Sequence, residues 1–135
     1  MPAKDRYHDA VKRALVKSEW IISDEQVTFQ VEDRIMWIDI EAVNVAAALV
    51  ILIEVKELEN VASSIEALAN ALGKFLLYRL ALEEARADVP LFLAVSELSY
   101  QGILTERIGQ LVIQRFNIPL IVFDPEREEF TRWIP

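Results

Sequence analysis

Residues 45–56 read Val-Ala-Ala-Ala-Leu-Val-Ile-Leu-Ile-Glu-Val-Lys, and this stretch decides the class of fold. Its first nine residues, 45–53, form the longest uninterrupted apolar run in the chain. An apolar, β-branched run that carries charge only at its end is typical of a strand covered on both faces. We therefore expect Ala46–Lys56 to form a strand in the middle of a sheet.

The segments before this strand predict a helix and a hairpin. Residues 4–18 place their apolar side chains at helical spacing, so a first amphipathic helix is expected to end near Glu19. Two β-branched and aromatic runs follow, Gln26–Gln30 and Arg34–Ile40, separated by Glu32-Asp33. This pattern predicts two antiparallel strands joined by a tight turn.

The segments after the central strand predict alternating helices and strands. Ser63-Ser64-Ile65-Glu66 has the pattern of a capping box and begins a helix that runs to about Arg86. The remaining elements are a strand at 91–95, a helix at 105–116, and strands at 118–123 and 129–134 joined by a turn at 124–128. The order αβββαβαββ, with no repeat or linker, predicts one α/β domain over residues 1–135 with a mixed central sheet flanked by helices.

Composition excludes several classes of function. The three glycines lie far apart, so the chain contains neither a GxGxxG fingerprint nor a P-loop. The absence of cysteine excludes disulfides and thiolate metal sites, so we expect a protein of the reducing cytoplasm. A nine-residue apolar run is far shorter than the roughly 20 residues that a membrane-spanning helix needs, so we expect no membrane segment.

The net charge of -8 argues against loose, non-specific binding of nucleic acid, because phosphate binding depends on Lys and Arg. The charge is unevenly spread, since residues 1–18 alone carry +3. Contact with nucleic acid would therefore depend on local basic patches or on metal ions.

Three charged residues fall where the predicted strands end. Side chains alternate along a strand, so Glu54 and Lys56 point to the same face while Ile53 and Val55 face the other layer. Asp39 lies near the end of the preceding strand, and its carboxylate can converge on that of Glu54 if the two strands pair. The pattern alone also fits an ordinary ion pair between Glu54 and Lys56 where the strand meets solvent.

These groups are suited to metal-assisted phosphodiester hydrolysis. Mg²⁺ prefers oxygen ligands, which Asp39, Glu54 and the backbone carbonyl of Val55 could supply. Lys56 would hold or help to deprotonate the attacking water. The chemistry needs a cation on the phosphoryl oxygens and an activated water, and it requires neither His nor Cys.

Asp39 and Ile53-Glu54-Val55-Lys56 together resemble the Asp…Glu-x-Lys signature of the PD-(D/E)XK, or restriction-endonuclease-like, nuclease superfamily, whose αβββαβ core matches the predicted order. More narrowly, segments along the whole chain resemble the XisH family. These segments are 1–5, 8–15, 71–73, 77–79, 108–111, 121–125 and 133–135.

The XisH family comprises the cyanobacterial fdxN element excision controlling factors. Its members are associated with site-specific excision of a DNA element during heterocyst development, alongside a recombinase and a companion family called XisI. The resemblance implies that Asp39, Glu54 and Lys56 are catalytic and that Asp39, Glu54 and Val55 bind Mg²⁺ or Mn²⁺. DNA, an XisI-family protein and the excision recombinase machinery are the implied partners. The alternative is a non-catalytic interaction protein that keeps the nuclease fold and regulates recombination through protein contacts.

Two residues depart from the pattern that the resemblance implies. His8 stands where many superfamily members have an acidic residue, and Lys74 stands where the family usually has Gln. Lys74 and Tyr78 are four residues apart and share a helix face that could look into the site. We expect His8, Lys74 and Tyr78 to contact substrate. The alternatives are a hydrogen-bonded, half-buried His8 and a solvated Lys74.

The last predicted strand is a candidate contact surface. Topology leaves residues 129–135 at an edge of the sheet, with Phe130, Trp133 and Ile134 available for a partner or for a second copy of the chain. The tryptophans are not interleaved with basic residues, so packing explains them better than stacking on nucleic-acid bases.

Overall fold

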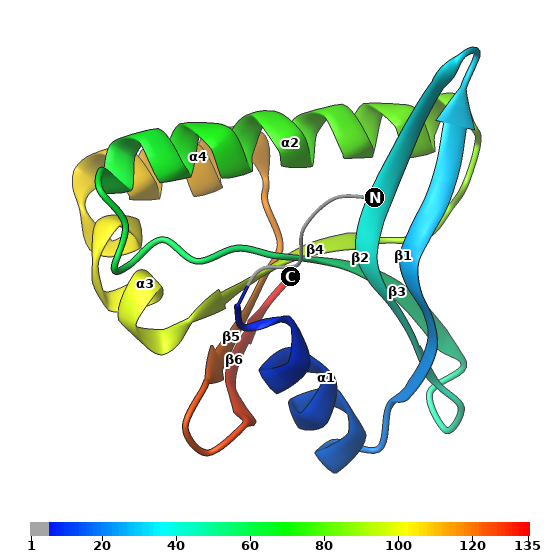
Figure 1. The fold of residues 1–135 in the computed structure, drawn as a ribbon, viewed down its shortest axis with the longest axis horizontal. Helices are drawn as coiled ribbons and strands as arrows, with labels where there is room; N and C mark the ends of the chain where they lie inside the picture. The colour runs from blue at the N-terminus through cyan, green and yellow to red at the C-terminus, as the bar shows by residue number, and fades with distance from the viewer. Residues whose placement is uncertain (1–5) are drawn as a thin grey trace.

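The computed structural model describes residues 6–135 as a six-stranded sheet with helices on both faces (Figure 1). The strands lie side by side in chain order, and β3 and β4 are the two central strands. Strands β3, β4 and β5 are parallel to one another, whereas β1–β2, β2–β3 and β5–β6 are antiparallel pairs. The predicted single α/β fold with a mixed central sheet is confirmed.

The elements include those that the sequence predicts, together with α3 and the 3₁₀ turn η1, which it does not predict. They are α1 (His8–Lys17), β1 (Ile21–Val31), β2 (Arg34–Asn44), β3 (Leu49–Val55), α2 (Ser64–Glu84), β4 (Leu91–Ser96), α3 (Glu97–Gln101), the 3₁₀ turn η1 (Ile103–Thr105), α4 (Arg107–Phe116), β5 (Leu120–Asp124) and β6 (Glu129–Ile134). The sequence did not predict α3, which begins directly after β4 because the Ser96 hydroxyl accepts a hydrogen bond from the Ser99 amide. At the start of α2, the Ser63 side chain accepts from the Glu66 amide, so the predicted cap is confirmed.

Several predicted boundaries differ from the observed ones. The apolar run does not begin as a strand, because residues 45–48 form the turn between β2 and β3. Asn44 stabilises this turn by accepting a hydrogen bond from the Ala47 amide. The helix predicted at 105–116 begins at Arg107 as α4, after the 3₁₀ turn η1, and β1 is longer than the predicted strand at 26–30. Residues 1–5, including the first two residues of the predicted helix at 4–18, lie outside the described part of the chain.

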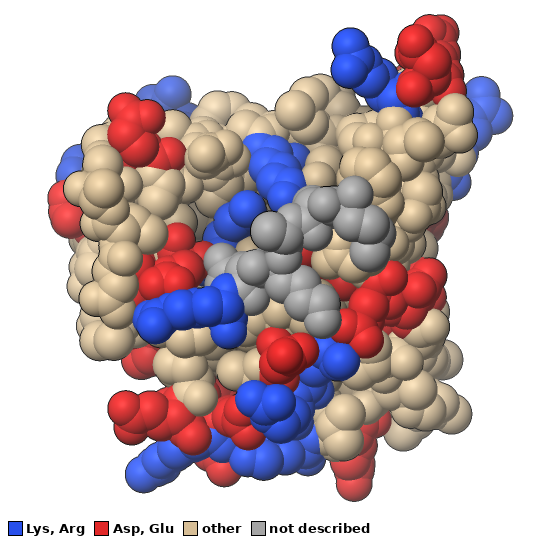
Figure 2. Space-filling view, viewed as in Figure 1, with Lys and Arg blue, Asp and Glu red and all other residues tan. Residues whose placement is uncertain are grey.

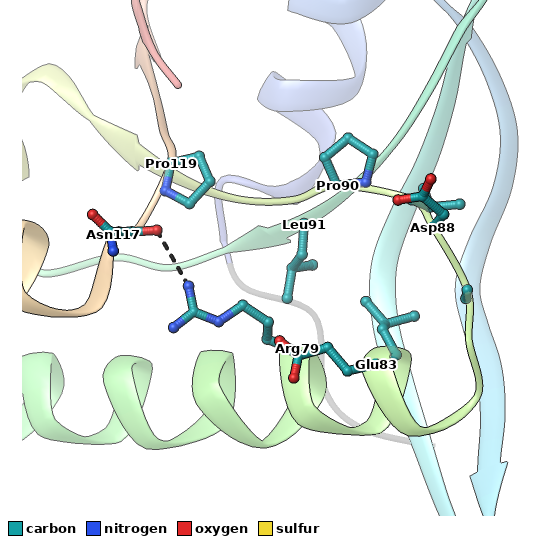
Figure 3. Close-up of a pocket in the computed structure, with 10 residues that line it drawn as sticks. Arg79, Glu83, Asp88, Pro90, Leu91, Asn117 and Pro119 are labelled. Atoms are coloured by element: carbon teal, nitrogen blue, oxygen red, sulfur yellow. Dashed lines mark hydrogen bonds between the residues drawn. The ribbon is translucent and has the colours of Figure 1, made fainter.

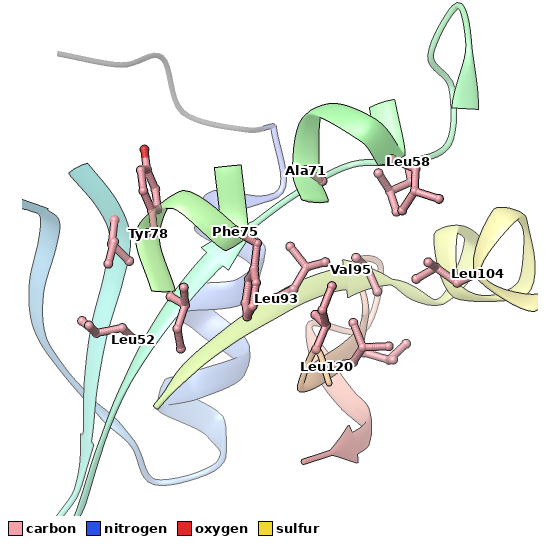
Figure 4. Close-up of a cluster of buried hydrophobic side chains, with 14 of the residues drawn as sticks. Leu52, Leu58, Ala71, Phe75, Tyr78, Leu93, Val95, Leu104 and Leu120 are labelled. Carbon is pink, nitrogen blue, oxygen red and sulfur yellow. The ribbon is translucent and has the colours of Figure 1, made fainter. Parts of the chain in front are cut away.

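Two apolar clusters hold the layers together. One fills the space between the sheet and α2 and α4, and it includes Phe75, Leu93 and Leu104 (Figure 4). The other packs α1 onto the opposite face through Val11, Leu15 and the side chains of β2, β3 and β5. Burial of this apolar surface is the main favourable contribution to folding. Among the helices of residues 6–135, none is long and apolar enough to span a membrane.

Two helical glycines have opposite surroundings, which predicts opposite responses to the same substitution. A Cβ at Gly73 in α2 would meet nothing within 4 Å, whereas one at Gly109 in α4 would overlap the Ile103 carbonyl oxygen. We expect Gly73→Ala to raise the free energy of unfolding by about 1 kcal/mol, because alanine is the better helix former. We expect Gly109→Ala to lower it by about 1–3 kcal/mol through backbone displacement.

Urea titration in dilute solution, followed by tryptophan fluorescence, measures both values. Destabilisation by Gly73→Ala, or a neutral Gly109→Ala, would contradict the packing described for α2 and α4.

Candidate functional site

The carboxylates of Asp39 and Glu54 meet where the ladder between β2 and β3 ends. The last paired residues are Ile40 and Ile53, so Asp39 and Glu54 occupy the next position along the two strands. At this position, carboxylate oxygens replace backbone carbonyls as the acceptors of hydrogen bonds between the strands. The Asp39 amide donates to Glu54 Oε1 at 3.1 Å, and the Val55 amide donates to Asp39 Oδ2 at 2.8 Å. The predicted convergence of the two carboxylates is confirmed by these crossed hydrogen bonds.

Burial makes negative charge costly at this position. Asp39 is 6% exposed and Glu54 is 1% exposed. Burial, followed by the repulsion from Asp39, raises the pKa of Glu54 to about 7. Burial also raises the pKa of Asp39, although the hydrogen bond from Val55 and the neighbouring cations oppose that effect. The pair is therefore poised to gain a cation or a proton.

Helix α2 directs two further polar side chains at the carboxylates. Lys74 Nζ lies 3.5 Å from Glu54 Oε2 and 5.5 Å from the centre of the Tyr78 ring. Burial lowers the pKa of Lys74, but Glu54, Tyr78 and Asp39 together raise it above its ordinary value. The predicted shared face of Lys74 and Tyr78 therefore looks toward Glu54. Lys56 follows β3 directly, and its charge lowers the pKa of both carboxyls.

His8 is buried on α1, where it hydrogen-bonds to Glu25 and opposes the rise in the pKa of Asp39. Its Nε2 lies 2.9 Å from Glu25 Oε1, and Lys12 forms an ion pair with the same carboxylate at 3.0 Å. These two neighbours hold the pKa of Glu25 below its usual range. Nδ1 of His8 is buried and has no hydrogen-bond partner among the described residues. Sequence reasoning singled out His8 but missed Glu25, because nothing in the sequence distinguishes Glu25 from the other polar residues of its strand.

Gln26, which the sequence analysis also missed, faces Asp39 across the β1–β2 ladder. Its neighbours in register are the pairs Glu25–Ile40 and Val27–Ile38. Ile38 packs in the cluster under α2 and Ile40 in the cluster under α1, although alternation would place both on one face. The hairpin therefore exchanges faces at this point, where Gln26 has a left-handed φ of 50°. Both atoms of its amide group are buried without a hydrogen-bond partner in residues 6–135.

A second polar cluster follows the ends of β3 and β4. Glu59 Oε2 accepts hydrogen bonds from Ser96 Oγ at 2.6 Å and from Ser99 Oγ. Burial opposes the charge on Glu59, but these bonds hold its pKa below the usual range. Burial and Glu59 together raise the pKa of Tyr7 to about 12. The hydroxyls of Ser96 and Ser99 thus serve the fold by anchoring the segment after β3.

A surface hollow elsewhere in the molecule is separate from the carboxylates. Arg79, Leu91, Asn117 and Pro119 line it at the amino ends of β4 and β5 (Figure 3). Arg79 donates to the Asn117 carbonyl oxygen at 3.2 Å and closes one side of the hollow. The carboxylate pair lies toward the carboxyl end of β3, which is the usual side for ligand sites at parallel strands.

The basic residues of α1 are mostly engaged by acidic groups or backbone. Arg13 forms an ion pair with Glu128 at 2.6 Å, and Lys17 donates to the Arg127 carbonyl oxygen at 2.7 Å. Figure 2 shows acidic and basic side chains interspersed on the viewed face, without a continuous basic surface among the described residues. Lys4, which contributes to the local positive charge in the sequence, lies outside those residues.

The donor set at Asp39 and Glu54 fits a hard divalent cation. No group of three or more His, Cys, Asp or Glu side chains with metal-site geometry occurs in residues 6–135, but Mg²⁺ needs only one or two carboxylates plus water. Glu54 Oε2 is buried without a hydrogen bond among these residues, and Lys74 is its ion-pair partner. A bound cation would satisfy this oxygen and relieve the repulsion between the carboxylates.

Comparison with solved structures finds the same fold in two cyanobacterial proteins. An XisH family protein from Nostoc punctiforme PCC 73102 superposes with a TM-score of 0.89 and 29% identity, over 97% of this chain and 100% of the other. An fdxN element excision controlling factor protein from Anabaena variabilis superposes with a TM-score of 0.90 and 31% identity, over 98% and 100%. No curated protein shows a significant match.

Fold and site together define a single-domain α/β protein with a paired-carboxylate site at the end of a central strand. The family model described as XisH protein matches residues 1–131. The chain therefore belongs to the XisH family.

The raised pKa of Glu54 predicts a pH-dependent cost to stability. The folded protein holds a proton on Glu54 up to about pH 7, whereas the unfolded chain releases it near the ordinary value of 4.5. Stability should therefore fall as pH rises between these values, by on the order of 3 kcal/mol in total. Without divalent metal, we expect Glu54→Gln to raise the melting temperature at pH 8 and to change it little at pH 5.

Thermal denaturation at both pH values provides the measurement, with the exposed Glu126→Gln as the matched control. An equal effect of Glu54→Gln at both pH values would show that the surroundings of Glu54 do not raise the pKa of its carboxyl group.

Proposed function

We propose that this protein is a divalent-metal-dependent phosphodiester hydrolase that acts on DNA. The observation that carries the proposal is the pair of crossed hydrogen bonds that brings two buried carboxylates together beside Lys74. Two buried acids with raised pKa values are costly for the fold unless they serve a ligand. The two-carboxylate set also explains how an acidic protein without Cys could act on phosphodiesters.

Each residue of the site has a defined task in this proposal. Asp39, Glu54 and the Val55 carbonyl would hold Mg²⁺ or Mn²⁺, which neutralises phosphoryl oxygens and activates water when bound. Lys56 would orient the attacking water and stabilise the charge that it acquires. Lys74 would turn from Glu54 toward the phosphate, and Tyr78 would limit the positions open to its ammonium group. His8 would act on the substrate only after release from Glu25.

Family membership suggests the setting of this reaction. One structural relative is named as an fdxN element excision controlling factor, so we propose that this chain also acts in programmed excision of a DNA element. The strand order β1–β2–β3, followed by a parallel β4 after a helix, supports assignment to the PD-(D/E)XK superfamily. An XisI-family companion and the excision recombinase would then be its partners in the cytoplasm.

A non-catalytic interaction protein is the second candidate function. Two observations favour it: the net charge of -8, and the ion pair that places Lys74 beside the free oxygen of Glu54. In this case Lys74 would permanently replace the metal, and the domain would regulate the recombination machinery through protein contacts.

Cleavage of DNA tests the proposed reaction directly. We expect the protein to cut supercoiled, linear or branched DNA with Mg²⁺ or Mn²⁺, alone or with its XisI-family companion. Glu54→Gln and Lys56→Ala should each lower the rate by about 10²-fold or more, because each removes a group that acts on metal or water. Glu126→Gln, purified in the same way, should retain full activity.

Equal cleavage by all these proteins would identify a contaminating nuclease as its source. That result, like inactivity in every combination, would favour the interaction protein.

Metal binding can be tested without substrate. We expect Mn²⁺ to raise the melting temperature of the protein at pH 8, because binding to the folded state alone stabilises it. The shift should be lost in Asp39→Asn and kept in Glu126→Gln. Since the carboxamide introduced by Asp39→Asn could still accept from the Val55 amide, loss of the shift would reflect lost ligand charge rather than lost fold. An Mn²⁺ shift that persists in Asp39→Asn would place the metal elsewhere.

A further inference from the structure

Glu54 has one carboxylate oxygen that the backbone does not engage, and Lys74 lies beside it. Glu54 Oε1 accepts a hydrogen bond from the Asp39 amide at 3.1 Å. Oε2 is buried and accepts no hydrogen bond among residues 6–135, and Lys74 Nζ lies 3.5 Å from it. Lys74 thus supplies positive charge next to the oxygen that a divalent cation would need. A cation that bound Oε2 would have to take this place from the ammonium group.

Lys74 is able to turn outward, whereas Tyr78 beside it is held in place. The side chain of Lys74 is 28% exposed, and its ammonium group ends a flexible four-carbon stem. Tyr78 is only 7% exposed, and its ring packs edge-on against Phe29 with 5.8 Å between the ring centres. Figure 4 shows the Tyr78 ring at the apolar cluster, with its hydroxyl group directed out of it. Movement on this side of Glu54 is therefore expected in Lys74.

The charges at the site are balanced before any ligand binds. The carboxylates of Asp39 and Glu54 are matched by the ammonium groups of Lys56 and Lys74, whose charges favour the ionised carboxylates. A divalent cation alone would add two positive charges, and Lys74 would repel it at close range. A phosphodiester group carries one negative charge, so it offers Lys74 a new partner outside the carboxylate pair. The anion thus favours the same outward movement of Lys74 that the cation requires.

We propose that Lys74 couples the binding of the metal ion to the binding of the phosphodiester strand, so that each ligand binds more tightly when the other is present. This inference rests on the proposed function, because both ligands belong to the reaction proposed above. In one state of the site, Lys74 pairs with Glu54 and opposes the metal ion. In the other state, Lys74 pairs with a phosphate group and leaves Oε2 to the metal ion. Because one movement serves both ligands, the coupling is reciprocal.

The coupling gives the internal ion pair a use in the absence of ligand. Lys74 keeps the buried Glu54 compensated until a strand arrives, which limits the cost of burying its charge. In the interaction protein considered above, the same ion pair would be permanent. The two cases differ in whether a phosphodiester strand releases Glu54 to the metal ion.

Mn²⁺ affinity without any strand tests the opposing role of Lys74. Isothermal titration at pH 8, above the pKa of about 7 of Glu54, measures it for the whole chain. We expect Lys74→Gln to bind Mn²⁺ about 10-fold more tightly than the unmodified protein, because the competing ammonium group is removed. Lys17→Gln removes the same charge from an exposed position on α1, so it should change the affinity by less than about 2-fold. An affinity that Lys74→Gln leaves unchanged or weakens would overturn the inference.

Strand affinity tests the coupling itself. Fluorescence anisotropy of a labelled oligothymidylate with phosphorothioate linkages, which resist hydrolysis, measures this affinity with and without Mn²⁺. We expect Mn²⁺ to tighten strand binding about 10-fold in the unmodified protein and less than about 3-fold in Lys74→Gln. Simple repulsion between Lys74 and the metal ion would leave the coupling intact. Equal coupling in the two proteins would therefore refute the proposal.

The variant Asp39→Asn separates failure of the coupling from failure of the proposed function. Mn²⁺ binding that Asp39→Asn abolishes but Lys74→Gln leaves unchanged would refute the coupling and keep the metal site. If neither the unmodified protein nor Lys74→Gln bound Mn²⁺, with or without the strand, the proposed metal site would be refuted and the coupling with it. Circular dichroism confirms that each variant is folded.

Discussion

The crossed hydrogen bonds between Asp39, Glu54 and Val55 are the constraint on which this molecule depends. They occur where β2 and β3 stop pairing through their backbones. Two buried amides would lack acceptors there, and an unpaired buried amide costs about as much as a lost hydrogen bond. Each carboxylate therefore completes the fold at the same time as it places its second oxygen in the site. Structure and candidate chemistry rest on the same two side chains.

This double role explains how an energetically costly site persists. A carboxylate that only bound ligand could turn toward solvent. Asp39 and Glu54 are instead held in the interior, because each accepts a hydrogen bond from a backbone amide of the neighbouring strand. Lys74 reduces the remaining charge from the opposite side, through α2. The sheet and the helix layer thus hold the two acids at close range, which is the arrangement that a divalent cation can exploit.

Much of the fold could be predicted because its signals are local. The run at 45–53 indicated the central strand, the Ser63–Glu66 cap indicated the start of α2, and strand alternation placed Glu54 on the face opposite Ile53 and Val55. The convergence of Asp39 on Glu54 followed from strand pairing.

What the sequence did not reveal depends on departures from local rules. The alanines at 46–48 read as strand until the Asn44 contact defines a turn, and α3 is shorter than two helical turns. The role of Gln26 in the site was missed for the same reason. Period-2 alternation assumes a regular hairpin, but Gln26 takes a left-handed conformation where the side chains of β2 change from one sheet face to the other. The partners of His8 and Glu59 come from segments distant in sequence, so only the folded chain brings them together.

The parallel pairing of β3 with β4 also determines how long one edge of β3 stays unpaired while the chain is synthesised. Residues 56–90 separate the two strands, and β4 is the neighbour that covers the open edge of β3. At ribosomal rates of about 5–20 residues per second, synthesis of residues 56–90 takes about 2–7 s, and the apolar edge of β3 is unpaired until β4 follows. The antiparallel meander of β1, β2 and β3 can form at once, but its last and most apolar strand stays open to other chains during that interval. Folding during synthesis is therefore the stage at which this protein is most exposed to aggregation.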